Sequence, residues 1–169
     1  MSHPLVLALF DDPGVAAAAA RNLRALGVPP IDVSVVTRSH DEEGVLARSA
    51  DASPGSELED FRPASRLGEL SAHLIAAVAL VMPGIGPIVA NGPLAAGLGE
   101  AAGHLAGGVA RALERAGLQE REAEDVEARV TAGAILIGAH VPSAGVDAAR
   151  ESLLRSGASP VMVGHWPDT

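Results

Sequence analysis

The chain contains one strand–helix–strand pattern twice, near its two ends. The first copy is LVLALFDDPGVAAAAARNLRALGVPPIDVSVV, residues 5–36, and the second is AILIGAHVPSAGVDAARESLLRSGASPVMVGHW, residues 134–166. In each copy an apolar segment leads through a proline-containing turn to a helix, and a glycine and a proline separate that helix from a second apolar segment. Two such units predict an α+β fold, a ferredoxin-like βαβ–insert–βαβ sandwich, with one four-stranded antiparallel sheet and helices on one face. A small parallel α/β sheet is the alternative.

The capping and helix-stopping residues of the first unit predict where its helix begins and ends. Asp12 is a good N-cap, and Pro13 suits the first helical position. Gly27 can end the helix in the left-handed conformation, and two prolines follow it. We therefore expect strands over 5–10 and 32–38, and a helix whose buried stripe is Val15, Ala19, Leu23 and Leu26.

The second unit has similar capping and helix-stopping residues. Ser143 is the expected N-cap, and Gly157 is the expected stop. The strands are expected over 134–141 and 160–166. The buried stripe of the helix is expected to be Val146, Ala149 and Leu153.

The length of 169 residues favours a single domain over residues 1–169. Its expected parts are a first βαβ half (1–39), an acidic loop (40–65), a helical insertion (66–133) and a second βαβ half (134–169). Within the insertion we expect a helical hairpin over 66–81 and 94–116, joined by MPGIGPIVANGP. A charged amphipathic helix should follow, with Ala123, Val126 and Val130 facing inward and Gly133 as its stop.

The glycine-rich stretch over residues 82–108 has three interpretations. A membrane segment is suggested because residues 70–99 carry no fixed charge, but Pro83-Gly84 interrupts the apolar run well short of the ~20 residues that a spanning helix needs. A phosphate-binding loop lacks support, because the GxGxxG spacing is missing. We favour helix packing, since four small residues recur at four-residue spacing and would let another backbone approach closely: Ala95, Gly99, Gly103 and Gly107.

Composition and charge exclude several function classes. The net charge of −9 argues against a nucleic-acid partner. The chain has neither cysteine nor lysine, which removes thiolate and Schiff-base chemistry. No basic segment and cleavage site mark the N-terminus, so we expect a cytoplasmic protein. The apolar run Ile135–Ile137 indicates a strand buried on both faces, covered either by the hairpin or by a second chain, and we expect a homodimer or a higher homo-oligomer.

Two sets of histidines are the candidate metal ligands. Glu100 and His104 lie one helical turn apart, and His73 on the facing helix would complete the first set. His140 and His165, near the ends of two strands, form the second set. In each case the alternative is a set of polar side chains that only contact solvent. We assign no catalytic residue and no cofactor.

The overall plan resembles the YflT-like bacterial general stress protein family. The segments that carry the resemblance are FDDPGVAAAAARNLRALGV, MPGIGPIVANGPLAAGLG, the acidic helix and AGAILIGAHV. The resemblance implies a stress-associated bacterial protein, and no catalytic residues come with it. We therefore expect a non-enzymatic structural or interaction protein that self-associates. A small-ligand or metal-binding module, with a pocket between sheet and hairpin, is the first alternative, and a protein that associates with a membrane through its hairpin is the second.

Overall fold

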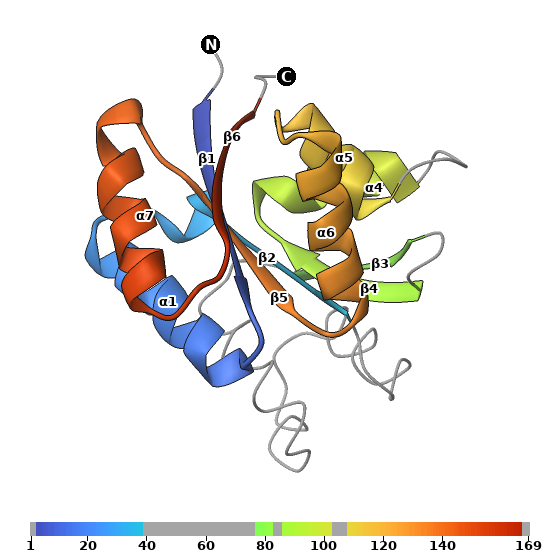
Figure 1. Cartoon of the computed structure of the whole chain (residues 1–169), viewed down its shortest axis with the longest axis horizontal. Helices are drawn as coiled ribbons and strands as arrows, with labels where there is room; N and C mark the ends of the chain where they lie inside the picture. Colours follow the sequence, from blue (N-terminus) through green and yellow to red (C-terminus); the bar gives the residue numbers. More distant parts are fainter. Residues whose placement is uncertain (1–2, 39–76, 83–85, 103–107, 167–169) are drawn as a thin grey trace.

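The computed structural model describes residues 3–38, 77–82, 86–102 and 108–166 (Figure 1). In this part of the chain one antiparallel sheet carries helices on both of its faces, which confirms the predicted α+β class, whereas the predictions of four strands and of helices on one face only were wrong. The six strands are β1 (His3–Phe10), β2 (Val33–Arg38), β3 (Ala77–Met82), β4 (Gly86–Asn91), β5 (Ile135–His140) and β6 (Val161–Trp166). Their order across the sheet is β3-β4-β2-β5-β1-β6.

The four strands of the two repeated units adjoin in the order β2-β5-β1-β6. β1 has β5 on one side (Leu5 opposite His140) and β6 on the other (Leu5 opposite Gly164). β2 pairs with the far side of β5. Because every neighbour is antiparallel, each unit places its two strands in separate positions and the other unit supplies the strand between them.

The first helix, α1 (Pro13–Ala25), begins where the sequence predicted. The Asp12 side chain accepts a hydrogen bond from the Val15 N–H at 3.0 Å. The predicted stripe is only half right, because Ala19 and Leu23 are buried whereas Val15 and Leu26 are 40% and 49% exposed. The buried face of α1 is made mostly of small alanine side chains, and it does not include the larger Val15 and Leu26.

The second crossover helix, α7 (Val146–Arg155), buries Ala149 and Leu153 as predicted, with Val146 partly buried. The predicted cap is wrong, because Ser143 lies in a 3₁₀ turn, η2 (Ser143–Gly145), and Gly145 is the N-cap. A second 3₁₀ turn, η1 (Pro30–Asp32), precedes β2. The predicted glycine stops are confirmed by positive φ angles at Gly27, Gly133 and Gly157.

The insertion differs most from the prediction. Residues 77–81 were expected to end a helix, but Ala77–Met82 is strand β3, and the expected connection contains strand β4. The cause is tertiary: β4 pairs with the free side of β2, and β3 pairs with β4. A short apolar run fits a buried strand as well as a buried helix, so its neighbours decide between the two.

The helix expected over 94–116 is also not continuous. Its described parts are α4 (Pro93–Ala102) and α5 (Val109–Arg115). Gly108 has an extended backbone (φ −120°, ψ −174°) and acts as the N-cap of α5. The row Ala95, Gly99, Gly103 and Gly107 therefore does not lie on one long helix that reaches residue 116. Gly103 and Gly107 themselves lie outside the described residues.

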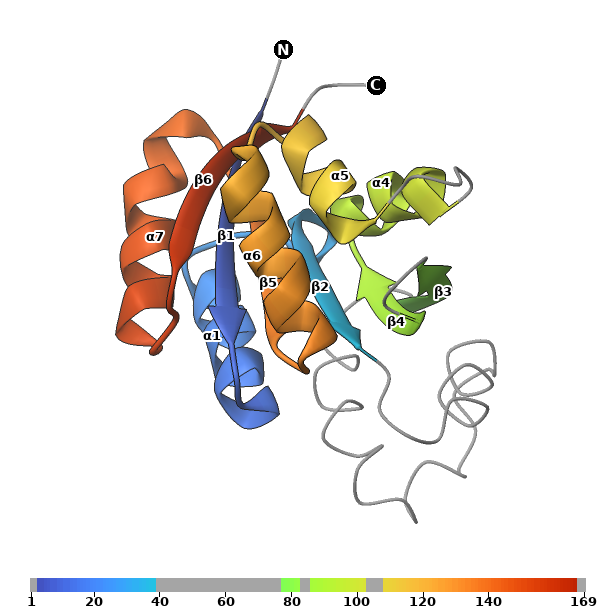
Figure 2. The same ribbon diagram turned by 45° about the vertical axis from the view of Figure 1, so that its right-hand side comes forward.

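Helices α4, α5 and α6 (Glu120–Thr131) cover the sheet face opposite to α1 and α7 (Figure 2). Alternate residues of β1 enter the two cores, so that Leu5, Leu7 and Leu9 face α4–α6 whereas Val6, Ala8 and Phe10 face α1 and α7. Helix α6 buries Ala123, Val126 and Val130, as predicted. The second face of β5, which suggested a partner chain, is thus covered by helices of the same chain.

Candidate functional site

His140, at the end of β5, is the histidine with the most unusual surroundings. It is partly buried, and its Nε2 atom is buried without a hydrogen-bond partner among the described residues. Its ring lies edge-on to Trp166, with ring centroids 5.8 Å apart and an interplanar angle of 77°. Burial lowers the pKa of His140 below its ordinary value, and His3 lowers it further, while the carboxylate of Asp32 acts in the opposite direction.

Trp166, at the end of β6, joins this histidine to the insertion. It lies opposite His3 on β1 and packs against the core under α4–α6. Gly97 of α4 lies beneath the indole, because a Cβ atom at that position would be 2.5 Å from the Cη2 atom of Trp166. Sequence reasoning missed this cluster. The available signal was that Trp166 is the only tryptophan of a chain with two other aromatic residues.

The predicted pair of His140 and His165 does not converge. His140 lies opposite Leu5, and His165 lies opposite Pro4, the next residue of β1. Successive residues of a strand point to opposite faces, so the two imidazoles lie on different sides of the sheet. His165 is exposed. The two histidines therefore cannot share a metal ion in this arrangement.

The other predicted ligands fall mostly outside the described part of the chain. His73 and His104 lie outside the described residues, and so does the side chain of Glu100. Within the ranges that the structure describes, no three His, Asp or Glu side chains gather to hold a metal ion. Of the predicted helix-packing residues, Ala95 is partly buried against the core under α4–α6, and the surroundings of Gly99 are not described.

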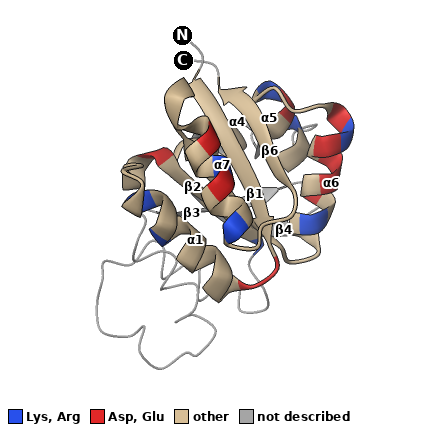
Figure 3. Cartoon of the chain, turned by 60° about the vertical axis from the view of Figure 1, so that its left-hand side comes forward, with Lys and Arg blue, Asp and Glu red and all other residues tan. Residues whose placement is uncertain are grey.

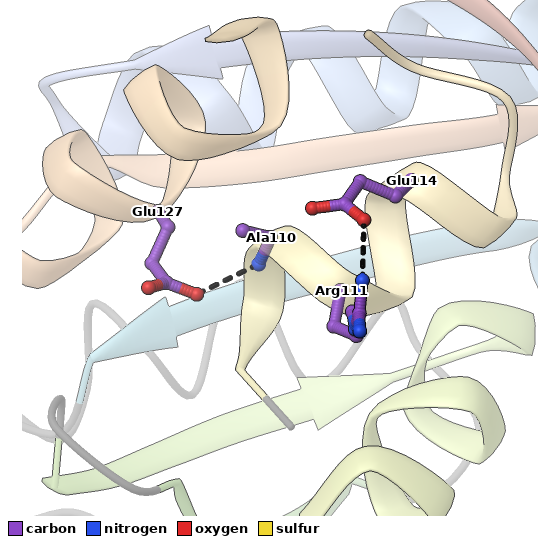
Figure 4. A network of polar contacts seen from close by, with 4 residues as sticks. All are labelled: Ala110, Arg111, Glu114 and Glu127. Atoms are coloured by element: carbon purple, nitrogen blue, oxygen red, sulfur yellow. Dashed lines mark hydrogen bonds and ion pairs between the residues drawn. The ribbon is translucent and has the colours of Figure 1, made fainter. Parts of the chain in front are cut away.

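Polar side chains near the insertion serve as helix caps. The buried Ser34 hydroxyl of β2 accepts a hydrogen bond from the Leu94 N–H at the start of α4, at 3.1 Å. The Glu127 carboxylate of α6 accepts from the Ala110 N–H at the start of α5, at 2.7 Å (Figure 4). These groups satisfy N–H donors that a helix start leaves open, so their geometry explains them without a catalytic role.

β6 is an outer strand of the six-stranded sheet, with β3 at the opposite edge, and it carries no Lys, Arg, Asp or Glu (Figure 3). The N–H of His165 points away from β1 and donates to the Ala116 carbonyl at 2.7 Å. Val161 and Val163 alternate along β6 in step with His165, so their backbone N–H and C=O groups also point away from β1. No described residue forms a hydrogen bond with these groups. The side chain of Val163 is 42% exposed, and Leu154 on α7 is an exposed apolar residue as well.

A second surface feature is a groove of about 630 Å³ between α1 and α7. It combines exposed apolar side chains with a few polar ones. Asn22 donates a hydrogen bond to the Ser156 hydroxyl at 3.2 Å across it. The lining residues are Asp12, Gly14, Val15, Ala18, Asn22, Ala25, Leu26, Ser152, Arg155 and Ser156.

Comparisons of the chain with family models, with curated proteins and with solved structures found no match in any of the three. None of the helices in the described ranges is both long enough and apolar enough to cross a membrane.

Proposed function

We propose that this chain is a non-enzymatic interaction protein that self-associates through the outer edge of β6. The strand order β2-β5-β1-β6, with α1 and α7 on one face, supports a ferredoxin-like scaffold for this role. The resemblance to general stress proteins favours a stress-associated role in the bacterial cytoplasm. The single observation that carries the proposal is the open strand edge at Val161 and Val163.

The edge is self-complementary. Two copies of β6 can pair antiparallel about a two-fold axis at Met162, which places Val161 of one copy opposite Val163 of the other. Both residues direct their N–H and C=O groups outward, so this register forms four backbone hydrogen bonds. It also places apolar side chains opposite each other on the α7 face, and no like charges meet within this register.

The covered end of the edge excludes pairings that are centred farther along β6. The His165 N–H is already bonded to Ala116, and the turn after α5 lies against β6 at Gly164. A pairing centred farther along β6 would displace that turn. A two-fold pairing about Met162 is the symmetric contact expected for a homodimer.

Val163→Lys tests the proposal. A lysine on an edge strand opposes strand pairing, and Val163 is exposed in the single chain, so the fold should tolerate the change. Sedimentation velocity over a range of protein concentrations should show a concentration-dependent dimer for the parent chain and a monomer for the variant. Ile31→Lys is the matched control, because Ile31 is 64% exposed but lies in η1, away from this edge. A parent chain that stays monomeric throughout, or an equal loss of dimer in both variants, contradicts the proposal.

A small-ligand-binding module is the second candidate, favoured by the groove between α1 and α7. Its volume lies within the range of known ligand pockets. Between the sheet and helices α4–α6, where such a pocket was expected, the described side chains form a hydrophobic core. Native mass spectrometry of protein purified from cells tests this candidate: a bound mass that is lost in Ala18→Phe would support it, and a bare chain would count against it.

A further inference from the structure

We propose that His140 and Trp166 form a proton-operated latch that holds the end of β6 against α4. The inference is independent of self-association, because all of its contacts lie within one chain. The latch consists of three parts in contact: His140 of β5 touches the indole of Trp166, and the indole lies against Gly97 of α4.

The neutral imidazole fits its place better than the cation does. The Nε2 atom is buried, and no described residue offers it an acceptor. A protonated imidazole donates from both nitrogens, so it would bring an unsatisfied charged donor into a site that is partly shielded from water. Protonation therefore favours any arrangement in which this nitrogen reaches solvent.

The neighbouring ionisable groups do not supply the missing acceptor. In the described part of the chain, those that act on His140 are Asp32 of η1 and His3 of β1. Asp32 attracts the cation and His3 repels it, and both are weaker than the effect of burial, which lowers the pKa of His140. Among the described residues, the indole of Trp166 is the aromatic ring in contact with His140. A cation above an aromatic face is attracted to it, and this attraction opposes the opening of the latch.

Trp166 is the part that must move when the latch opens. Gly97 lies against its ring, with no room for even one more carbon atom. The indole thus contacts both His140 of β5 and α4, and it has no space to move toward Gly97. A protonated His140 reaches water when the indole and the end of β6 swing outward, which separates Trp166 from α4.

The single tryptophan makes the movement measurable. The chain has no tyrosine, so its near-ultraviolet-excited emission reports on Trp166 alone. An indole that leaves the core for water emits at longer wavelength. We expect the emission of the full chain to move to longer wavelength between pH 7.5 and pH 5, with a midpoint below 6.5, while far-ultraviolet circular dichroism stays constant.

Two variants separate His140 from the other titrating groups. H140Q should keep the emission of the neutral protein throughout this pH range, whereas H165Q should behave as the parent does, because His165 lies on the opposite face. Gly97→Ala should push the indole outward and give the long-wavelength emission already at pH 7.5, which tests the latch even if H140Q does not fold.

Three results would overturn the proposal. The first is a transition of equal size in H140Q. The second is an emission that loses intensity without moving in wavelength, since this would show that protonated His140 stays against the indole. The third is a midpoint above 6.5 for His140 in a histidine NMR titration, since the attraction between cation and indole would then outweigh burial.

Discussion

Gly164→Ala is the substitution for which the structure predicts the clearest cost. A Cβ atom at Gly164 would lie 2.3 Å from the Ala116 carbonyl oxygen and 3.0 Å from a methyl group of Leu118. The first contact is with backbone, which cannot rotate away. The turn after α5 must therefore move off β6, and with it the hydrogen bond from the His165 N–H to Ala116.

The magnitude follows from opposing effects. Overpacking costs about 1–3 kcal/mol, and a lost hydrogen bond costs about 1 kcal/mol. Alanine reduces the entropy of the unfolded chain, which returns about 0.4–1 kcal/mol. We expect a net loss of about 1–3 kcal/mol in the free energy of unfolding, which for a chain of this size lowers Tm by roughly 2–12 °C.

Differential scanning calorimetry measures the change, with Gly145→Ala as the matched control. Gly145 has a φ of −94°, and a Cβ atom there would have no neighbour closer than 3.5 Å. The control should be neutral or slightly stabilising. If Gly164→Ala melts at the parent temperature or above it, the close approach of β6 to the turn after α5 is not present in the protein.

Three further changes follow from the caps and from the partly buried His140. Glu127→Ala removes the acceptor at the start of α5 and should lower the free energy of unfolding by about 1–2 kcal/mol in urea denaturation, whereas Glu114→Ala, which breaks only an exposed ion pair with Arg111, should cost less than about 0.5 kcal/mol. Ser34→Ala leaves the Leu94 N–H unsatisfied in the core and should cost about 1–3 kcal/mol in the same assay. Because the pKa of His140 is lowered in the folded chain, the unfolded chain binds the proton first, so urea midpoints should fall as the pH drops below about 6.5 and this part of the fall should vanish in H140Q.

The two outer units could be predicted from the sequence because their signals are local. Asp12 and Gly27 set the two ends of α1 through contacts that span three or four residues. The residues that make such contacts are close neighbours in the sequence. The insertion could not be predicted in this way. Residues 86–91 form a strand because β2 offers them a free edge, and β2 lies about fifty residues earlier in the chain.

The candidate site depends even more on tertiary structure. His140 and Trp166 lie on strands that are not neighbours, and they meet because β1 lies between them with Leu5 opposite one and His3 opposite the other. A shift of either register by one residue would turn one of the two rings to the other face. The sequence predicted that both histidines lie near strand ends, but it did not predict which face of the sheet each side chain points to. For this reason the prediction that His140 and His165 form a pair was wrong.

Some glycines of residues 82–108 that are not part of the predicted row Gly99, Gly103 and Gly107 lie close to other elements. At three of them a Cβ atom would meet an element outside the stretch: Val33 and Ser34 of β2 at Gly92, Trp166 of β6 at Gly97, and Glu127 of α6 at Gly108. The nearest approach is 2.4 or 2.5 Å in each case. Glycine at positions 92 and 97 therefore lets the insertion lie directly on both repeated units, whereas Gly108 meets α6 within the insertion. Selection for such contacts does not require a four-residue period, because each contact has its own partner.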